Sequence, residues 1–283
     1  MAGEAGNREG DREGELIRVC VAGVTGWAGN AVAHAIIATS DMRLIAGVSR
    51  SAAGKSLDDA LSVEGVDGKV FSTVEEALSV ASADVLIDFT SAASAKGNVL
   101  AAIQRNVHVV NGSSGLTEDD YAAIQELATQ HHVGVVALAN ASVMAALLQH
   151  FAVQAAKLLP SWEIIDYASA GKIDVPSGTS RQLAERLGEV RRPGGSRPVD
   201  ELIGPREARG ASVAGTQIHS LRLPSYLVST EVIFAQPGER LSMRHEPGES
   251  PAPYVAGTLL AIRSVVHHAG LIRGLDALLF PNG

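Results

Sequence analysis

One short segment of the chain, residues 166–180 (DYASAGKIDVPSGTS), combines the residue types of an enzyme active site. Lys172 supplies an ammonium group, Asp174 supplies a carboxylate, and Ser177–Thr179 form a tight turn after a proline. Backbone N–H groups and a threonine hydroxyl in such a turn are good receptors for a carboxylate. The segment contains no histidine, which is the side chain that most often transfers protons in enzymes. It therefore raises the question of which group would supply a proton there.

A glycine pattern near the start of the chain points to a second kind of site. Residues 19–29 (VCVAGVTGWAG) follow a β-rich run and open a helix-like stretch. In that context a dinucleotide's pyrophosphate approaches the backbone closely and accepts hydrogen bonds from helix N–H groups. The alternative is a tight turn that needs glycine only for packing. We favour the dinucleotide site and expect it to use Gly23, Thr25, Gly26, Trp27, Ala28 and Gly29.

The end of the second expected strand bears on the choice of cofactor. A site for NAD usually has an acidic residue there, which holds the ribose 2′-hydroxyl. This chain has Ser49 and Arg50 at that point, with Lys55 close behind and no carboxylate. We therefore favour NADPH, whose 2′-phosphate Arg50 would meet, with NADH as the alternative. Arg50 as a solvated loop charge is the competing interpretation.

Two further loops are expected at the same edge of the sheet. One contains Phe89 and Thr90, and the other contains Gly112, Ser113 and Ser114. Small residues after the carboxyl ends of parallel strands line the crevice where ligands bind in open α/β sheets. These residues would let a nicotinamide lie close to the backbone, although ordinary turn chemistry is the alternative.

The elements that must position these residues follow from the hydrophobic pattern. Short apolar β-rich runs alternate with helix-like stretches as far as residue 140, which predicts a Rossmann-type, doubly wound parallel sheet. Continuous apolar strands fit a sheet that is covered on both faces. The expected strands are 16–23, 42–48, 69–73, 84–89, 108–111 and 134–138, and the expected helices are 28–39, 73–80, 92–105 and 117–131.

The pattern changes in the second half of the chain. Helices are expected at 142–159 and 180–190, a strand at 162–167, and β-type alternation with turns over 217–245. This predicts an α+β domain with a mixed or antiparallel sheet. We divide the chain into a disordered leader (1–15), a dinucleotide-binding domain (16–140), a substrate-binding and oligomerisation domain (141–253), and a C-terminal helix (254–283) that packs back on the nucleotide domain.

The composition narrows the classes of function. Of the 283 residues, 46% are hydrophobic and 19% are charged, which suits a globular protein with a substantial core. The net charge of −8 argues against binding to nucleic acids or to anionic membranes. The lone Cys20 lies in an apolar run, and the first fifteen residues lack the apolar core of a signal peptide. We therefore expect a cytoplasmic protein, without a metal site.

The order and spacing of these motifs resemble dihydrodipicolinate reductase, also called 4-hydroxy-tetrahydrodipicolinate reductase, over roughly residues 16–280. The most specific element is K-x-D-x-P-S-G-T at residues 172–179. The other motifs are GVTGWAG at 23–29, DFT at 88–90, GSSG at 112–115 and AN-x-S at 139–142.

The resemblance implies a two-domain reductase that passes hydride from NAD(P)H to an unsaturated cyclic imine dicarboxylate, a step of lysine biosynthesis. In the family, Lys172 and the turn of Ser177, Gly178 and Thr179 would hold this small-molecule substrate, and Asn140 would lie at the cofactor. The resemblance also implies a homo-oligomer, a tetramer or a dimer, assembled through the C-terminal sheets.

The chain departs from the family at the proton donor. The family has E-x-H-H where this chain has Asp166, Tyr167, Ala168 and Ser169. Losing a positioned general acid costs on the order of 10²–10⁴-fold in rate. The nearby candidates are Tyr167, whose side chain would point away from Ala168 in a strand, and Lys172, if burial lowers its pKa.

Solvent and two distant histidines are the other sources of a proton. Water would suffice for a substrate that is already a protonated iminium. His219 and His245 are expected to be structural or surface histidines. A further departure is Ala141, which stands where the family often has a larger aromatic residue and which suggests a roomier pocket.

Three functions follow from this combination of features. The chain either reduces the lysine-pathway intermediate with a relocated acid, or it is a divergent imine reductase or amine dehydrogenase with another substrate. A non-catalytic dinucleotide-binding scaffold is the third reading, and the retained K-x-D-x-P-S-G-T segment argues against it.

Overall fold

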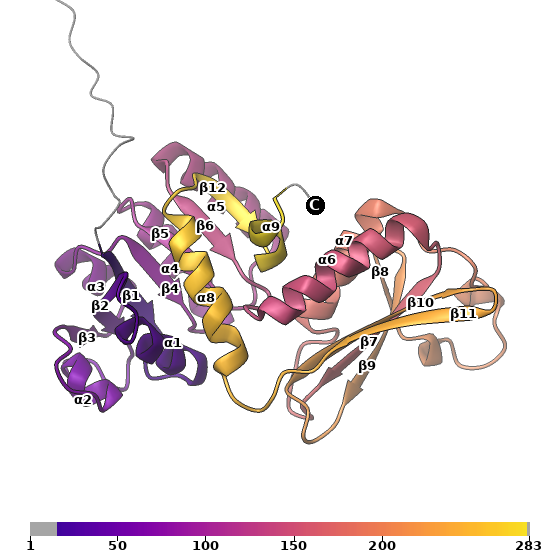
Figure 1. Cartoon of the computed structure of the whole chain (residues 1–283), viewed down its shortest axis with the longest axis horizontal. Coiled ribbons are helices and arrows are strands. Elements are labelled where there is room, and N and C mark those ends of the chain that lie inside the picture. The colour runs from indigo at the N-terminus through magenta and orange to yellow at the C-terminus, as the bar shows by residue number, and fades with distance from the viewer. Residues whose placement is uncertain (1–15, 282–283) are drawn as a thin grey trace, which may run out of the picture.

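The chain folds around two β-sheets, which lie side by side in the structure, a computed structural model that describes residues 16–281 (Figure 1). The expected leader at residues 1–15 lies outside the described residues. Within residues 16–281, each helix is too short or too polar to span a bilayer.

The first sheet is parallel and has seven strands in the order β12-β6-β5-β4-β1-β2-β3. Its strands are continuous apolar runs because both faces are covered by helices. The strands are β1 (Ile17–Ala22), β2 (Met42–Val48), β3 (Lys69–Phe71), β4 (Val85–Asp88), β5 (His108–Asn111), β6 (Gly134–Ala137) and β12 (Gly270–Arg273).

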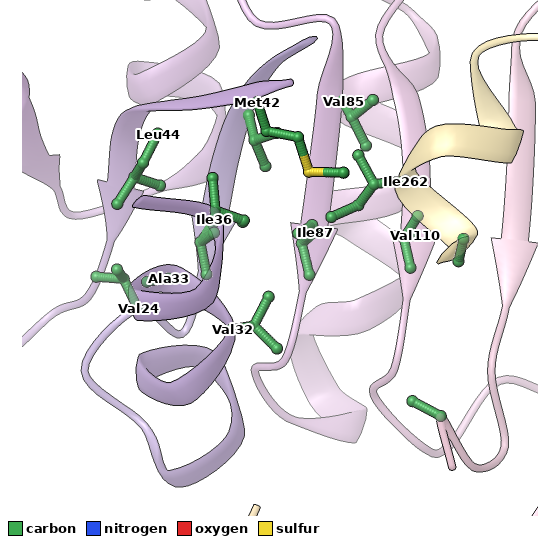
Figure 2. Packing of buried hydrophobic residues seen from close by; sticks show 14 of the residues in the cluster. Val24, Val32, Ala33, Ile36, Met42, Leu44, Val85, Ile87, Val110 and Ile262 are labelled. Atoms are coloured by element: carbon green, nitrogen blue, oxygen red, sulfur yellow. The ribbon is translucent and has the colours of Figure 1, made fainter. Parts of the chain in front are cut away.

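Two hydrophobic clusters cover the two faces of this sheet. On one face, α1 (Trp27–Ile37) and α8 (Ala252–Val265) pack against the strands, and Figure 2 shows Ile36 and Ile262 among the buried side chains there. On the other face lie α3 (Val74–Val80), α4 (Ala92–Ile103) and α5 (Glu118–His131). The short α2 (Leu57–Leu61) lies beside β3. The predicted doubly wound parallel sheet is confirmed.

The second sheet is mixed and has five strands in the order β11-β10-β7-β9-β8. β7 is parallel to β9 and antiparallel to β10. One face is covered by α6 (Val143–Leu158) and α7 (Gly178–Val190), whose apolar side chains pack on the sheet. The predicted α+β domain is thus confirmed. Its strands are β7 (Trp162–Ala168), β8 (Ala211–Val213), β9 (Thr216–Arg222), β10 (Val228–Gln236) and β11 (Glu239–His245), and short 3-10 turns span Val199–Glu201 and Arg206–Arg209.

The C-terminal segment returns to the first sheet (Figure 1). The helix expected in the C-terminal segment 254–283 ends at Val265, and Gly270 follows with a φ of 92°. Residues Gly270–Arg273 then form β12, which pairs with β6, and α9 (Leu275–Leu279) packs against α6. The prediction of a single terminal helix is therefore wrong, because a left-handed glycine stops the helix and the next four residues pair with a strand edge.

Candidate functional site

The glycine loop between β1 and α1 is packed tightly against the loop after β4. Gly23 has a φ of 80°, and a Cβ there would lie 2.3 Å from the Phe89 backbone oxygen. A Cβ at Gly29 would lie 2.1 Å from the Gly23 oxygen. Packing alone thus requires glycine at both positions. Gly26 is less crowded, since its Cβ would meet only the Gly23 oxygen at 3.1 Å.

The start of α1 is suited to an anion. Gly26 is its N-cap, no side chain caps the helix, and the first turn contains no acidic residue. The N–H groups of Trp27 and Ala28 at this 11-residue helix therefore remain available to a pyrophosphate. The residues present fit a bound dinucleotide.

Two hydroxyl side chains meet at the end of β2. Thr25 Oγ1 and Ser49 Oγ are 2.7 Å apart, which ties the glycine loop to the β2 loop. Arg50 is exposed, and its guanidinium makes no hydrogen bond or ion pair within residues 16–281. The end of β2 therefore offers two hydroxyls and, within residues 16–281, a cation without a partner.

Asp88 joins the two small-residue loops of this edge. It is fully buried at the end of β4, and its Oδ1 accepts hydrogen bonds from Thr90 N (2.8 Å), Thr90 Oγ1 (2.6 Å) and Ser113 Oγ (3.0 Å). Oδ2 accepts one from Asn98 Nδ2 (3.0 Å). The Phe89 ring fills the space over Gly112, where a Cβ would lie 2.2 Å from the ring. The loops after β4 and β5 therefore form one connected wall.

A cavity of about 540 Å³ runs from this wall to the second domain. It brings together the loop of Gly112, Ser113 and Ser114 with Lys172 and the turn of Ser177, Gly178 and Thr179. The cavity is lined by Ala92, Asn111, Gly112, Ser113, Ser114, Gly115, Leu116, Thr117, Glu118, Tyr121, Ala137, Leu138, Ala139, Asn140, Lys172, Ile173, Asp174, Ser177, Gly178, Thr179, Arg181, Gln182, Glu185, Val228, Tyr254 and Arg273.

The predicted carboxylate-binding turn forms the start of α7. The Ser177 hydroxyl accepts a hydrogen bond from Ser180 N and caps the helix. Asn140, after β6, donates from Nδ2 to Thr179 Oγ1 at 3.4 Å and so links the two domains across the cavity. Lys172 Nζ lies 2.8 Å from Asp174 Oδ1. The site thus presents an ammonium group, hydroxyls and helix N–H groups to one cavity.

The carboxylate of Asp166 holds this turn by hydrogen bonds from the second sheet. It is fully buried on β7 and accepts hydrogen bonds from Ser177 N (3.0 Å), Ser180 Oγ (3.1 Å), Ser220 Oγ (3.0 Å) and Arg222 Nη2 (2.9 Å). Burial would raise the pKa of Asp166, but the hydrogen bonds from Ser177, Arg222 and Ser220 outweigh it and lower the pKa. The ionised carboxylate therefore fixes the position of the turn.

The two halves of this arrangement correspond to two domains of one known family. Residues 17–141 match the family description "Dihydrodipicolinate reductase, N-terminus", and residues 144–279 match "Dihydrodipicolinate reductase, C-terminus". The chain belongs to the dihydrodipicolinate reductase family. Members of this family are NAD(P)H-dependent oxidoreductases of lysine biosynthesis.

Relatives of the family share nearly the full length of the chain. The 4-hydroxy-tetrahydrodipicolinate reductase of Syntrophomonas wolfei subsp. wolfei is 32% identical over 265 residues, covering 93% of this chain and 98% of that protein. The enzyme of the same name from Desulfitobacterium hafniense is 34% identical over 264 residues, with coverage of 93% and 98%.

One solved structure of the family and one more distant structure were compared with the fold. A dipicolinate-bound dihydrodipicolinate reductase from Paenisporosarcina sp. TG-14 superposes with a TM-score of 0.75 at 28% identity, covering 93% of this chain and 99% of that chain. An amine dehydrogenase from Mycobacterium smegmatis has a TM-score of 0.57 at 13% identity, covering 92% and 95%, and shares the fold.

Tyr167, considered as a proton donor, lies on the other face of the second sheet. Its hydroxyl donates to Glu231 Oε2 at 2.9 Å, and the Arg244 guanidinium stacks over its ring at 4.5 Å. Burial and the hydrogen bond to Glu231 raise the pKa of Tyr167. The side chain is not part of the cavity wall, because neighbours along a strand point to opposite faces.

The two histidines of the second sheet also lie away from the cavity wall. His219 Nε2 is 2.7 Å from Glu163 Oε2 on the same outer face as Tyr167. His245 is buried, with Nε2 3.2 Å from Ser142 Oγ at the start of α6, and burial lowers its pKa. Both histidines make local contacts that suit a structural role.

The roomier pocket expected at Ala141 is not found. Ala141 is 3% exposed and packs in the core of the first domain, where Gly257 lies close to its backbone oxygen. That expectation is wrong because Ala141 does not line the cavity. Ala168 is fully buried as well.

Several residues of the cavity wall were not anticipated. Arg181, Gln182 and Glu185 project from one face of α7 toward Glu118, Tyr121 and Arg273 of the first domain. Residues three and four apart share a helix face, so positions 181, 182 and 185 follow directly from a helix that begins at the predicted turn. Trp27, which is 50% exposed, reaches the cavity indirectly, through edge contact with Tyr254 at 5.7 Å.

Proposed function

We propose that this chain is an NAD(P)H-dependent reductase that acts on the C=N bond of a small carboxylated substrate, with 4-hydroxy-tetrahydrodipicolinate as the first candidate. The observation that carries the proposal is the shared cavity. It has the loop at Gly112–Ser114 on one side and Lys172 with the turn at Ser177–Thr179 on the other. A dinucleotide and a carboxylate would therefore meet in one cavity.

We propose that the dinucleotide is held by the residues that the sequence indicated. The pyrophosphate would rest on the N–H groups of Trp27 and Ala28. Arg50 would pair with a 2′-phosphate, which favours NADPH over NADH. The loops around Phe89, Thr90, Ser113 and Ser114, together with Asn140, would hold the nicotinamide end. The reduced dinucleotide, when bound, supplies a hydride.

We propose that Lys172 and the turn at Ser177, Gly178 and Thr179 receive a substrate carboxylate. The ammonium group and the first N–H groups of α7 would both bond to carboxylate oxygens. The relative from Paenisporosarcina sp. TG-14 is described as bound to dipicolinate, a dicarboxylate, which supports this class of ligand.

A divergent imine reductase with another carboxylated substrate is the second candidate. Ala168 and Ser169 occupy the positions at which the family's histidine pair is expected, and neither is part of the cavity wall. Such a change at the proton-donating position, beside retained carboxylate-binding elements, favours altered chemistry or substrate over simple loss of function. The binding elements for a carboxylate are the same in both cases.

We also propose a homo-oligomer formed through the outer face of the second sheet. That face carries Tyr167, Glu231, Arg244, Glu163 and His219 and is covered by none of the elements described within residues 16–281. A cytoplasmic location fits the single buried thiol, Cys20.

The decisive experiment measures NADPH and NADH oxidation by the purified protein with freshly generated 4-hydroxy-tetrahydrodipicolinate. A panel of carboxylated and uncarboxylated cyclic imines is run beside it. Turnover of the pathway intermediate would support the first candidate. Turnover of another carboxylated imine alone would support the second. Tight dinucleotide binding without any turnover would indicate a non-catalytic scaffold and would end the proposal.

A further inference from the structure

The cavity wall contains a carboxyl group that no other group holds. Glu185 lies on α7, lines the cavity and is partly buried. Within residues 16–281 its carboxyl makes no hydrogen bond and no ion pair with another residue. A polar group in such a position remains free to exchange a proton with a bound molecule.

Two other carboxyl groups of the cavity wall form ion pairs. Glu118 forms a bidentate ion pair with Arg273, with both N···O distances at 2.9 Å. Asp174 pairs with Lys172, and although burial opposes it, the bond from Lys172 lowers the pKa of Asp174. Each of these two carboxyl groups is therefore paired with a cation.

The surroundings of Glu185 favour its protonated form. Burial is the largest cause and raises the pKa of Glu185; Arg273 opposes this, while the nearby Glu118 adds to it. Arg181 lowers this pKa slightly and Glu189 raises it, and Tyr121 is the remaining titratable neighbour on α5. The net effect is a raised pKa.

Glu185 and the substrate turn lie on the same helix and line the same cavity. Glu185 follows Thr179 by six residues, which corresponds to about 9 Å along a helix axis. Helical Cα–Cβ bonds tilt toward the N-terminus, so the glutamate side chain extends back along α7. A small ring anchored by its carboxylate at the turn would span much of the remaining distance.

We propose that Glu185 donates the proton that completes reduction of the imine, in place of the missing histidine pair. This inference rests on the proposed reductase function. As the imine carbon accepts the hydride, the π electron pair of C=N moves onto nitrogen. The Glu185 O–H bond breaks, its proton forms the new N–H bond, and the carboxylate left behind is reprotonated from water.

The first test needs neither cofactor nor substrate. Protein labelled with ¹³C at glutamate carboxyl carbons is titrated by NMR, and Glu185→Gln assigns the Glu185 signal. We expect the Glu185 signal to titrate at higher pH than that of the exposed Glu126, and we expect Glu118→Gln to lower its midpoint. A midpoint equal to that of Glu126 would overturn the inference.

The second test compares turnover of the wild type, Glu185→Gln, Glu185→Asp and the control Glu126→Gln on the imine that the wild type reduces fastest. We expect Glu185→Gln to lower kcat on the order of 10²–10⁴-fold, with KM little changed and partial rescue by Glu185→Asp. The decline of kcat at alkaline pH should disappear in Glu185→Gln. If the wild type is active and Glu185→Gln is unaffected, the role of Glu185 is refuted and the reductase function stands. If the wild type is inactive on the whole imine panel, the reductase function is refuted.

Discussion

Lys172 and Asp174 form an ion pair inside the candidate cavity, with 2.8 Å between Nζ and Oδ1. The lysine side chain is 27% exposed and the aspartate 34%, so the pair is reachable from solvent. The backbone oxygen of Asp174 accepts a hydrogen bond from Arg222 at 2.7 Å, which fixes the chain while leaving the carboxylate free to turn. A substrate carboxylate must therefore compete with Asp174 for the ammonium group.

Lys172→Ala should weaken binding of carboxylated substrates. A hydrogen bond to a charged group is worth about 1.5–3 kcal/mol, so KM should rise roughly 10- to 100-fold for a carboxylated imine. Asp174→Asn should have the opposite effect, because it removes the competing carboxylate. Steady-state kinetics on a carboxylated and an uncarboxylated imine would measure both changes. The exposed Lys157 of α6 provides a control as Lys157→Ala, and equal effects on both imines would argue against carboxylate binding by Lys172.

Asp166→Asn should destabilise the second domain. The substitution leaves the Arg222 guanidinium buried without its carboxylate partner, and breaking a buried ion pair costs roughly 3–5 kcal/mol. Denaturant unfolding of the variant would measure the loss. Asp41→Asn, which breaks an exposed pair with Arg263, provides the comparison and should cost far less.

The same carboxylate should make stability depend on pH. Since the pKa of Asp166 is lowered in the folded state, its contribution is complete above the unfolded value of about 3.9. The contribution is lost as pH falls through the lower folded value. The wild type should therefore lose stability below about pH 4, whereas Asp166→Asn should show a flatter profile there. Parallel acid-unfolding curves for the two proteins would contradict this assignment.

Arg50→Ala should reduce affinity for NADPH and leave NADH binding unchanged, because Arg50 is expected to meet only the 2′-phosphate. Loss of one charge-assisted hydrogen bond corresponds to roughly a 10-fold change or more in Kd. Titration calorimetry with both dinucleotides would separate the two effects. Arg43→Ala on β2, whose side chain pairs with Asp67, controls for loss of a surface cation. An equal loss of affinity for both cofactors would contradict the role.

Most of the fold could be predicted because short sequence patterns mark its strands and helices. Apolar runs of β-rich sequence alternate with helical stretches, and the capping box of Thr117 with Asp120 marks the start of α5 within four residues. β12 escaped prediction because its four residues lie in the stretch 254–283 that was assigned to the C-terminal helix. Gly270–Arg273 become a strand only through pairing with Gly134–Ala137, more than 130 positions earlier.

The motifs of the candidate site could be predicted from the sequence, but the hydrogen bonds between distant residues that hold them could not. The chain order showed Lys172 and the following turn, but Asp166 is tied to Ser220 and Arg222, which are 54 and 56 positions away. That network depends on strand register, which no short pattern contains. The spacing of positions 181, 182 and 185 could have identified the helix face on which Glu185 lies. That its carboxyl makes no hydrogen bond or ion pair depends on where the first domain lies, which spacing along one helix does not give.

Tyr167→Phe should leave kcat for imine reduction unchanged, because the hydroxyl bonds to Glu231 on the face opposite the cavity. The lost hydrogen bond should cost about 1 kcal/mol of stability in the monomer. If the outer sheet face forms the oligomer, the variant should also dissociate at higher protein concentration than the wild type. Analytical ultracentrifugation and steady-state kinetics would test the two expectations separately. A large fall in kcat with intact assembly would make Tyr167 a candidate proton donor again.

Asp88→Asn should disturb the cofactor wall without unfolding the first domain. Asp88 Oδ1 accepts three hydrogen bonds from Thr90 and Ser113, and Oδ2 accepts one from Asn98 Nδ2. An asparagine at position 88 can accept the first three with its carbonyl oxygen. Its NH₂ group would then face the Nδ2 donor of Asn98. This donor–donor clash should loosen the contact between the two loops that are expected to hold the nicotinamide. We expect kcat to fall more than dinucleotide affinity, and hydride transfer from a deuterated cofactor to lose stereospecificity. The double variant Asp88→Asn with Asn98→Asp restores a donor–acceptor pair and should recover much of kcat. If the single variant kept full kcat and stereospecificity, Asp88 would serve the fold of the loops alone.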